Sequence, residues 1–182
     1  MCSSDYLVTG RGDRATSSAP PPAPKPDYYL HPGGVLVSPQ PCTITTILGS
    51  CVSVCLFDSQ RRIGGMNHFL LSRPLGPEAR PGRFGESAVA LLIQQLEGLG
   101  CRPLDLKGKV FGGARINGAG GEGRNNLGAE NVGVAFELLR RAGIPVVAQD
   151  TCGDFGRKVL FHTDDGTAWV RRIGGGTNDD RR

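Results

Sequence analysis

The chain has 182 residues, of which 38% are hydrophobic and 21% charged, with a formal net charge of +4. This length allows one domain with a hydrophobic core, and the composition is typical of a globular protein. The positive charge is scattered and forms no basic stripe of the kind that nucleic-acid-binding proteins carry. No apolar run approaches the ~20 residues that span a bilayer. We therefore expect neither nucleic-acid binding nor membrane insertion.

The N-terminal sequence contains no uninterrupted apolar segment of the length that a secretory signal requires. We therefore expect a cytoplasmic protein whose six cysteines are reduced rather than paired in disulfides.

Both ends of the chain have the composition of tails. Residues 1–27 include the proline-rich stretch SSAPPPAPKP and show no periodic apolar pattern, and residues 174–182 are polar. The sequence predicts disorder in both, with one domain over 28–173 between them.

The first half of this domain predicts strands, because short apolar runs alternate with turn residues. Residues 52–58 are rich in apolar and β-branched residues on both faces, which indicates a strand buried on both sides. The predicted strands are 33–38, 43–48, 52–58 and one within 61–72.

The second half predicts two amphipathic helices. Apolar residues recur at helical spacing over 88–99 and over 132–142, and glycines follow each run. Strands are also expected at 107–114 and 144–150, and as a hairpin around Asp164-Asp165-Gly166. About eight strands and two helices predict an α+β fold, a layered β-sandwich with flanking helices.

Most of the stretch TITTILGSCVSVCLFD is typical of a buried β-strand, but Gly49-Ser50-Cys51 interrupts it. A cysteine at such a break is either a small core residue or an exposed nucleophile. A nearby imidazole would favour the nucleophile by supplying the acid–base chemistry that thiol catalysis needs. If the strand 52–58 pairs with the strand that follows it, His68 lies at the same end of the hairpin as Cys51.

A threonine hydroxyl from the preceding strand could orient this imidazole. Thr43, Thr45 and Ile47 share a strand parity with Cys51, although the break between them makes their facing uncertain. Gly49 would allow close backbone approach and leave N–H groups available to an oxyanion.

Other interpretations of these residues stay open. Cys51 and His68 could simply be packed in the core, and Cys51, Cys55 and His68 could bind zinc, although their spacing is unusual and a fourth ligand is missing. Gly118, Gly120 and Gly123 match the G-x-G-x-x-G pattern, but they do not lead directly into a helix as a dinucleotide site requires. A flexible loop is the preferred reading, and no cofactor or metal is predicted.

Six segments occur in this order along the chain: LHPGGVLVS, TTILGSCVSVCLFD, IGGMNHFLL, VFGGA, LGAENV and GDFGRKVLF. Together they resemble the CheD family, the chemoreceptor glutamine deamidases of bacterial and archaeal chemotaxis. The resemblance runs from about residue 29 to residue 173 and implies a fold similar to the catalytic domain of cytotoxic necrotizing factor toxins. Two departures from the family pattern are Ser72, where proline is frequent, and Cys152, where glycine is usual.

The resemblance implies a catalytic set of Cys51 as nucleophile, His68 as base and Thr45, six residues before the cysteine, as its orienting partner. The choice of Thr45 over Thr43 and Thr46 rests on that family spacing. Gly49, Ser50 and Asn67 are expected to shape the site and its oxyanion-binding groups.

The implied reaction converts receptor glutamines to glutamate through a thioester, without a cofactor. The implied partners are methyl-accepting chemotaxis receptors and a CheC-type phosphatase. Two alternatives remain: a non-catalytic module that regulates such a phosphatase, and another thiol acyl-transfer enzyme of transglutaminase or amidase type.

Overall fold

The computed structural model of the chain describes residues 6–7, 25–73, 81–115 and 127–174. Its strands are β1 (Tyr6–Leu7), β2 (Asp27–Tyr29), β3 (Val35–Ser38), β4 (Thr43–Leu48), β5 (Val52–Asp58), β6 (Ile63–Asn67), β7 (Leu106–Gly112), β8 (Val146–Thr151), β9 (Gly156–His162) and β10 (Ala168–Ile173). Its helices are α1 (Gly85–Gly98) and α2 (Leu127–Arg141), with short 3₁₀ turns η1 (Pro81–Arg83) and η2 (Pro103–Asp105).

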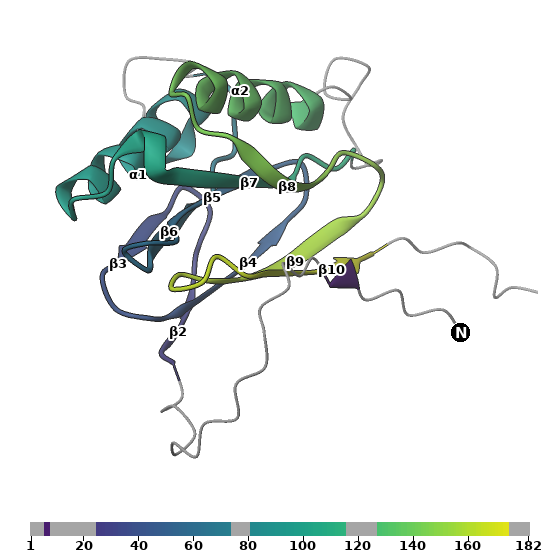
Figure 1. The fold of residues 1–182 in the computed structure, drawn as a ribbon. Coiled ribbons are helices and arrows are strands. Elements are labelled where there is room, and N and C mark those ends of the chain that lie inside the picture. Colours follow the sequence, from purple (N-terminus) through teal and green to yellow (C-terminus); the bar gives the residue numbers. More distant parts are fainter. Residues whose placement is uncertain (1–5, 8–24, 74–80, 116–126, 175–182) are drawn as a thin grey trace, which may run out of the picture.

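The described elements form three layers, with the two helices on one side of two stacked sheets (Figure 1). Sheet A has the strand order β1-β10-β9-β4-β2, and sheet B has the order β3-β6-β5-β7-β8. Most neighbouring strands are antiparallel, with parallel pairing only between β2 and β4 and between β7 and β8 in the described part. The predicted α+β sandwich with flanking helices is confirmed.

Two hydrophobic cores hold these layers together. One lies between the helices and sheet B and includes Val52, Val54, Leu92 and Leu139. The other lies between the two sheets and includes Ile44, Leu48, Cys55 and Phe161. Strand β5 contributes to both cores, and all seven of its residues are buried, including the polar Ser53 and Asp58. Its predominantly apolar sequence predicted this burial on both sides.

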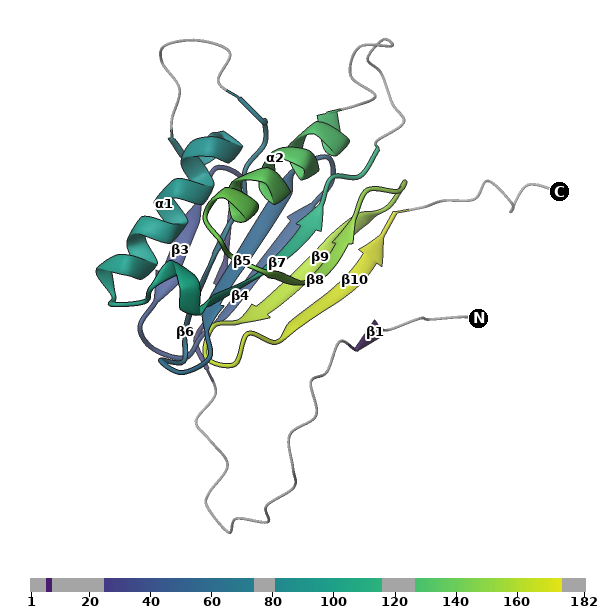
Figure 2. The ribbon, with the colours of Figure 1, turned by 45° about the horizontal axis from the view of Figure 1, so that its top comes forward.

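Both predicted helices are present and lie side by side across sheet B (Figure 2). The buried side of α1 includes Ala88, Val89, Leu92 and Leu96, whereas Gln95, which has the same helical spacing within 88–99, is exposed. The hairpin predicted around Asp164-Asp165-Gly166 is also present, as the antiparallel pair of β9 and β10.

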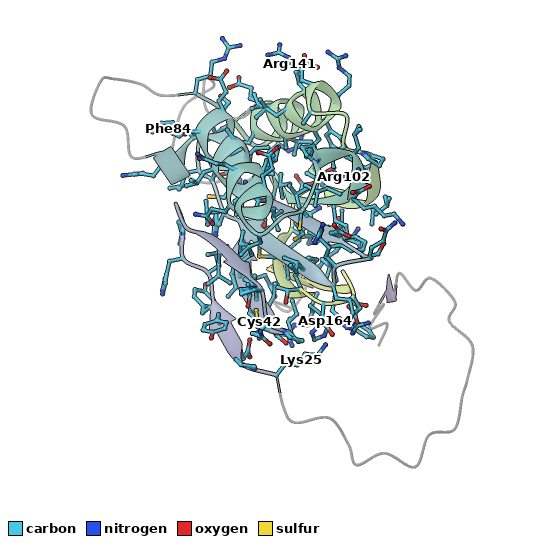
Figure 3. All side chains as sticks on the ribbon, turned by 60° about the vertical axis from the view of Figure 1, so that its left-hand side comes forward. Lys25, Cys42, Phe84, Arg102, Arg141 and Asp164 are labelled. Atoms are coloured by element: carbon cyan, nitrogen blue, oxygen red, sulfur yellow. The ribbon has the colours of Figure 1, made fainter. Side chains whose placement is uncertain are left out.

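An ion pair connects the start of the domain to this hairpin. The Lys25 ammonium lies 2.6 Å from the Asp164 carboxylate, which also receives Arg62 at 3.1 Å. Lys25, Cys42 and Asp164 lie at the end of the molecule away from the helices (Figure 3). Ion pairs with a nearly buried carboxylate are less screened by solvent than exposed ones, so this contact helps to hold β2 in place.

The predicted tails lie largely outside the described residues. Within the predicted N-terminal tail, the structure describes β1 and the beginning of β2, which starts one residue before the predicted boundary. The glycine-rich segment with Gly118, Gly120 and Gly123 also lies outside. Among the helices that the structure describes, none is both long and apolar enough to cross a bilayer.

Candidate active site

The segment Gly49-Ser50-Cys51 is the point at which the chain passes from one sheet to the other. Strand β4 ends at Leu48 in sheet A, and β5 begins at Val52 in sheet B. A continuous strand could not belong to both layers, so the apolar run has to break here. The break places Cys51 at the edge of the core between the sheets, where it is half-buried.

All three carbonyl groups of this crossover segment accept hydrogen bonds from neighbouring elements. Gly49 O accepts from the Ala114 amide at 2.8 Å, and Cys51 O accepts from the Gly113 amide at 2.8 Å. Ser50 O accepts from the Asn131 side chain at 3.1 Å. Among the described residues, the N–H groups of the segment donate to no other residue. This pattern fixes the backbone while leaving donors available to a negatively charged oxygen.

The Cys51 thiol is protonated at neutral pH in this structure. Burial raises the pKa of the Cys51 thiol above its ordinary value, and the residue's own backbone N–H offsets part of that rise. The thiol therefore needs a base that removes its proton during attack.

His68 is in a position to be that base. Strands β5 and β6 are antiparallel with Cys55 opposite Met66, and the pairing continues as a bridge between Val52 and Phe69. In this register Cys51 and His68 are diagonal neighbours on one face of sheet B, a relationship with Cα atoms about 7–8 Å apart that side chains can span. The predicted pairing of the two strands is confirmed, with β6 ending at Asn67, and the described contacts include no hydrogen bond between the Cys51 and His68 side chains.

A single threonine determines which nitrogen of His68 carries the proton. Thr46 Oγ1 lies 2.9 Å from His68 Nδ1 and donates its own proton to the Leu30 carbonyl at 2.7 Å. Because a hydroxyl has one proton, Thr46 must accept from Nδ1–H. The lone pair is therefore on Nε2, which is buried and has no hydrogen-bond partner among the described residues.

Burial of this imidazole lowers the pKa of His68 to about 4, against a weaker opposing contribution from the Leu30 carbonyl. The ring is therefore neutral at neutral pH, and Nε2 is able to accept a proton. The Cys51 thiol and the His68 imidazole are therefore both neutral at rest, rather than the thiolate and imidazolium found where a charged partner lowers the thiol pKa.

The orienting contact predicted for Thr45 is corrected by this geometry. Thr45 Oγ1 donates to Asp27 at 3.3 Å, on the side of sheet A that faces away from sheet B. Ile44, Thr46 and Leu48 point into the core between the sheets and are fully buried. Strand alternation therefore places Thr46, and not Thr45, beside the imidazole.

Asn67 shapes the strand that carries His68. Its Oδ1 accepts from the Val54 amide at 2.8 Å, and its carbonyl accepts from Ser53 Oγ at 2.6 Å. The alternation of β6 places Asn67 on the opposite face from Met66 and His68. Its described contacts are therefore with the backbone of β5, which supports a site-shaping role and not a direct contact with Cys51.

Asn131 and Gly112 are parts of this site that the sequence analysis missed. Asn131 is fully buried on α2, and its Nδ2 bridges the carbonyls of Ser50 at 3.1 Å and Leu70 at 2.9 Å. Its signal was a polar side chain on an otherwise apolar helix face. Gly112 has φ +107°, and a Cβ there would collide with the Cys51 carbonyl. Its signal was the pair of glycines in VFGGA.

No group of three or more His, Cys, Asp or Glu side chains in the described ranges is arranged to hold a metal ion. Cys55, the second cysteine of the zinc alternative, is fully buried, and burial raises the pKa of its thiol to about 12. The donor set Cys51, Cys55 and His68 does not form a metal cluster in this structure.

The fold and this pair define a class: a two-sheet α+β protein with a half-buried thiol and a buried neutral imidazole between its sheets. The family model described as CheD chemotactic sensory transduction matches residues 72–172. The chain belongs to the CheD family. The matched range lies C-terminal to both Cys51 and His68, so the family match does not include these two residues.

Several curated relatives align over most of the chain. A protein of Anaeromyxobacter dehalogenans named probable chemoreceptor glutamine deamidase CheD 1 is 48% identical, over 88% of this chain and 95% of that protein. Proteins named probable chemoreceptor glutamine deamidase CheD from Rhodospirillum rubrum and Sulfurimonas denitrificans are 42% and 34% identical, over 82% and 80% of this chain and 83% and 93% of those proteins.

Two solved structures align with the chain at lower similarity. The hypothetical protein YfiH of Bacillus licheniformis aligns with a TM-score of 0.44 at 17% identity, over 65% of this chain and 51% of that chain. A Neisseria meningitidis protein of the DUF152 family aligns with a TM-score of 0.44 at 14% identity, over 82% of this chain and 76% of that chain. The predicted likeness to cytotoxic necrotizing factor toxins stays a prediction.

Proposed function

We propose that this protein is a chemoreceptor glutamine deamidase that uses Cys51 as its nucleophile and His68 Nε2 as its base. The names of the relatives supply the reaction and the substrate class. The observation that carries the residue assignment is the buried Nε2 of His68, which has no hydrogen-bond partner among the described residues and lies on the same face of sheet B as the Cys51 thiol.

In the first half of the reaction, His68 Nε2 takes the proton of the Cys51 thiol as the sulfur attacks the side-chain carbonyl carbon of a glutamine. The N–H groups of Gly49, Ser50 and Cys51 stabilise the resulting oxyanion. The tetrahedral intermediate then collapses, the C–N bond breaks, and the imidazolium protonates the departing ammonia. A thioester between Cys51 and the substrate remains.

In the second half, His68 Nε2 takes a proton from water, and the oxygen attacks the thioester carbon. The C–S bond breaks, the sulfur regains its proton from the imidazolium, and the substrate leaves as glutamate. Thr46 holds the imidazole in the tautomer that both halves need, because it accepts from Nδ1–H. This assignment replaces the one predicted for Thr45.

The proposal includes the surroundings in which the enzyme acts. Its substrates are glutamines on the cytoplasmic helices of chemotaxis receptors, which places the protein in the cytoplasm. A CheC-type phosphatase, implied by the family resemblance, is its second partner.

The test is mass spectrometry of a purified chemoreceptor cytoplasmic fragment after incubation with the protein. We expect conversion of particular glutamines to glutamate with release of ammonia, and none with Cys51→Ala. Cys55→Ala, which removes a thiol four residues further on, is the matched control and should retain the activity. Conversion by Cys51→Ala would refute the nucleophile.

The same experiment separates the alternatives. Ammonia release without an added amine distinguishes deamidation from a transglutaminase-type transfer. A wild-type protein that binds a CheC-type phosphatase but converts no glutamine would be the non-catalytic module.

A further inference from the structure

We propose that Asn131 is a positioning residue that holds the segment of the nucleophile against the segment of the base. This inference rests on the proposed function. Its side-chain nitrogen donates to Ser50 O, one residue before Cys51, and to Leu70 O, two residues after His68. One side chain of α2 therefore joins the two segments whose relative position the reaction requires.

The two contacts require an amide. Ser50 O and Leu70 O are both acceptors, and the Asn131 nitrogen has two protons, one for each carbonyl. A carboxylate at this position would have no proton to donate and would place acceptor oxygens next to both carbonyl oxygens. An apolar side chain would leave both carbonyls without this donor.

The other end of the same side chain shows that Asn131 is not optimised for helix stability alone. Its Oδ1 is buried and has no hydrogen-bond partner among the described residues, which is unfavourable for folding. The neighbouring buried positions on this helix face carry Gly128, Val132, Ala135 and Leu139. A polar residue kept in this apolar row, with half of its bonding capacity unused, indicates a requirement for its two donors.

The two hydrogen bonds from Asn131 to the Ser50 and Leu70 carbonyls form a clamp between the two segments. Loss of this clamp should move the backbone N–H groups of residues 49–51 relative to His68. A displacement of about 1 Å in a catalytic arrangement can lower the rate about 10²-fold. We expect kcat of Asn131→Leu and Asn131→Asp to fall by about that factor. The KM should stay within about twofold, because Asn131 is buried and does not contact the substrate.

The matched control is Val132→Ala, which removes packing from the same helix and core but leaves the clamp intact. Its melting temperature should fall, while its kcat stays near that of the wild type. If the kcat values of the Asn131 variants merely follow their melting temperatures on the line that Val132→Ala defines, Asn131 is a structural residue only and the inference is wrong.

Hydrogen exchange provides a readout that does not depend on deamidation. Amides of residues 49–52 and 69–71 should exchange faster in the Asn131 variants than in Val132→Ala at matched stability. Unchanged exchange at both segments overturns the clamp even if the protein is an active deamidase. Faster exchange in a protein that shows no deamidase activity would retain the clamp and refute only the proposed function.

A different observation carries a second inference, which concerns the outer face of sheet A. Ile47, Lys158 and Arg171 are direct cross-strand neighbours on β4, β9 and β10. Strand alternation directs all three away from the core, and Ile47 is 45% exposed. The helices lie on the far side of sheet B, so neither α1 nor α2 covers this row (Figure 1).

The two cations in this row are not neutralised within the described chain. Arg157 and Arg172 share Asp150, at 2.8 and 3.6 Å, whereas Lys158 and Arg171 pair with no carboxylate of the described residues. Like charges directly opposite each other destabilise an antiparallel pair. Their arrangement therefore favours an external anionic group.

We infer that this row binds an acidic helix of the protein substrate. The row spans two strand spacings, about 10 Å, which is the width of an α-helix. Carboxylates on one side of such a helix would face Lys158 and Arg171, and an apolar residue would contact Ile47. The row lies at the Cys51 end of β4, four residues before the nucleophile, so a helix bound here extends toward the site.

The test is the binding of the chemoreceptor cytoplasmic fragment to Lys158→Thr/Arg171→Thr in the Cys51→Ala background. We expect the Kd to rise about tenfold with a weaker dependence on salt, and the melting temperature to rise because the repulsion is removed. Arg141→Thr, on α2, is the control and should leave the Kd unchanged. An unchanged Kd in the double variant refutes the surface. The surface is also refuted if the double variant binds the receptor fragment normally and loses binding only to vesicles that contain phosphatidylserine.

Discussion

Thr46 and His68 are joined by a hydrogen bond whose direction is determined by a third group. Thr46 Oγ1 lies 2.9 Å from His68 Nδ1, and its only proton is used on the Leu30 carbonyl at 2.7 Å. The imidazole therefore carries its proton on Nδ1 and its lone pair on Nε2. In the proposed mechanism, the neutral Thr46 hydroxyl has the role of the acidic residue in serine-protease triads, which holds the imidazole in one tautomer and orientation.

Replacement of this hydroxyl should cost much of the activity. In Thr46→Val the Nδ1–H group loses its acceptor, so the competing tautomer with the proton on Nε2 becomes more populated. We expect kcat for receptor-fragment deamidation to fall about 10²-fold, within the range that acid–base assistance contributes. Thr46→Ser retains the hydroxyl and should keep most of the activity.

Thr45→Val is the control for the neighbouring position that the family spacing favoured. Its hydroxyl contacts Asp27 on the other side of the strand, so kcat should remain close to that of the wild type. A loss with Thr45→Val and none with Thr46→Val would contradict the structural assignment and restore the original one.

The fold was largely predictable because its signals are local. The predominantly apolar sequence of β5 predicted a strand buried on both sides, and the turn at Asp164-Asp165-Gly166 predicted the β9–β10 hairpin. Nothing in the local pattern shows that β4 and β5 belong to different sheets. That arrangement depends on pairing between segments far apart in the chain, such as Ile44 with Phe161.

The same limit explains which part of the site was predictable. The proximity of Cys51 and His68 followed from a hairpin between neighbouring strands. The threonine could not be chosen by counting parity through Gly49-Ser50-Cys51, because the chain changes sheets there and the alternation of β4 does not continue into β5. Asn131 reaches the site from a helix 80 residues further along the chain than Cys51, a contact that only the packed structure shows.

The neutral state of the thiol predicts how Cys51 reacts with iodoacetamide. Burial raises the pKa of Cys51, so the thiolate fraction should be small at neutral pH and the alkylation rate should rise steadily as the pH becomes alkaline. We expect the rate for Cys51 at neutral pH to be below that of an unburied cysteine in a peptide. The measurement is alkylation followed by peptide mass spectrometry, with Cys51→Ala to identify the site.

A plateau of the rate that begins below pH 7 would contradict this picture. It would indicate that Cys51 and His68 form a thiolate–imidazolium pair before the substrate binds.

The buried imidazole also predicts a loss of stability in mild acid. The pKa of His68 is lowered to about 4 in the folded protein, whereas an unfolded histidine titrates near 6.5. As the pH falls from about 6.5 to about 4, the unfolded chain binds a proton that the folded chain does not, so the stabilisation present above pH 6.5 is lost. The difference in pKa corresponds to about 3 kcal/mol of unfolding free energy at most.

Urea unfolding at about pH 7.5 and about pH 4.5 measures this loss. His68→Gln cannot titrate at this position and should lose less stability over this interval than the wild type, because the two proteins differ in no other titratable group. Equal losses in the two proteins would show that His68 is not buried in its neutral form.

Substitution of Gly112 in β7 tests whether the position of the crossover segment, residues 49–51, matters for activity. Its φ of +107° is unfavourable for other residues, and a Cβ at this position would collide with the Cys51 carbonyl. The same carbonyl oxygen accepts a hydrogen bond from the amide of the next residue, Gly113. Gly112→Ala should therefore both destabilise the fold, by roughly 1–3 kcal/mol, and displace Cys51. Gly98→Ala, at the end of α1 where a Cβ meets nothing within 4 Å, is the matched control.

We expect Gly112→Ala to lose deamidase activity at temperatures where circular dichroism shows that it remains folded, and Gly98→Ala to keep its activity. If Gly112→Ala were as active as the wild type while folded, the position of the Cys51 carbonyl would not be critical for catalysis.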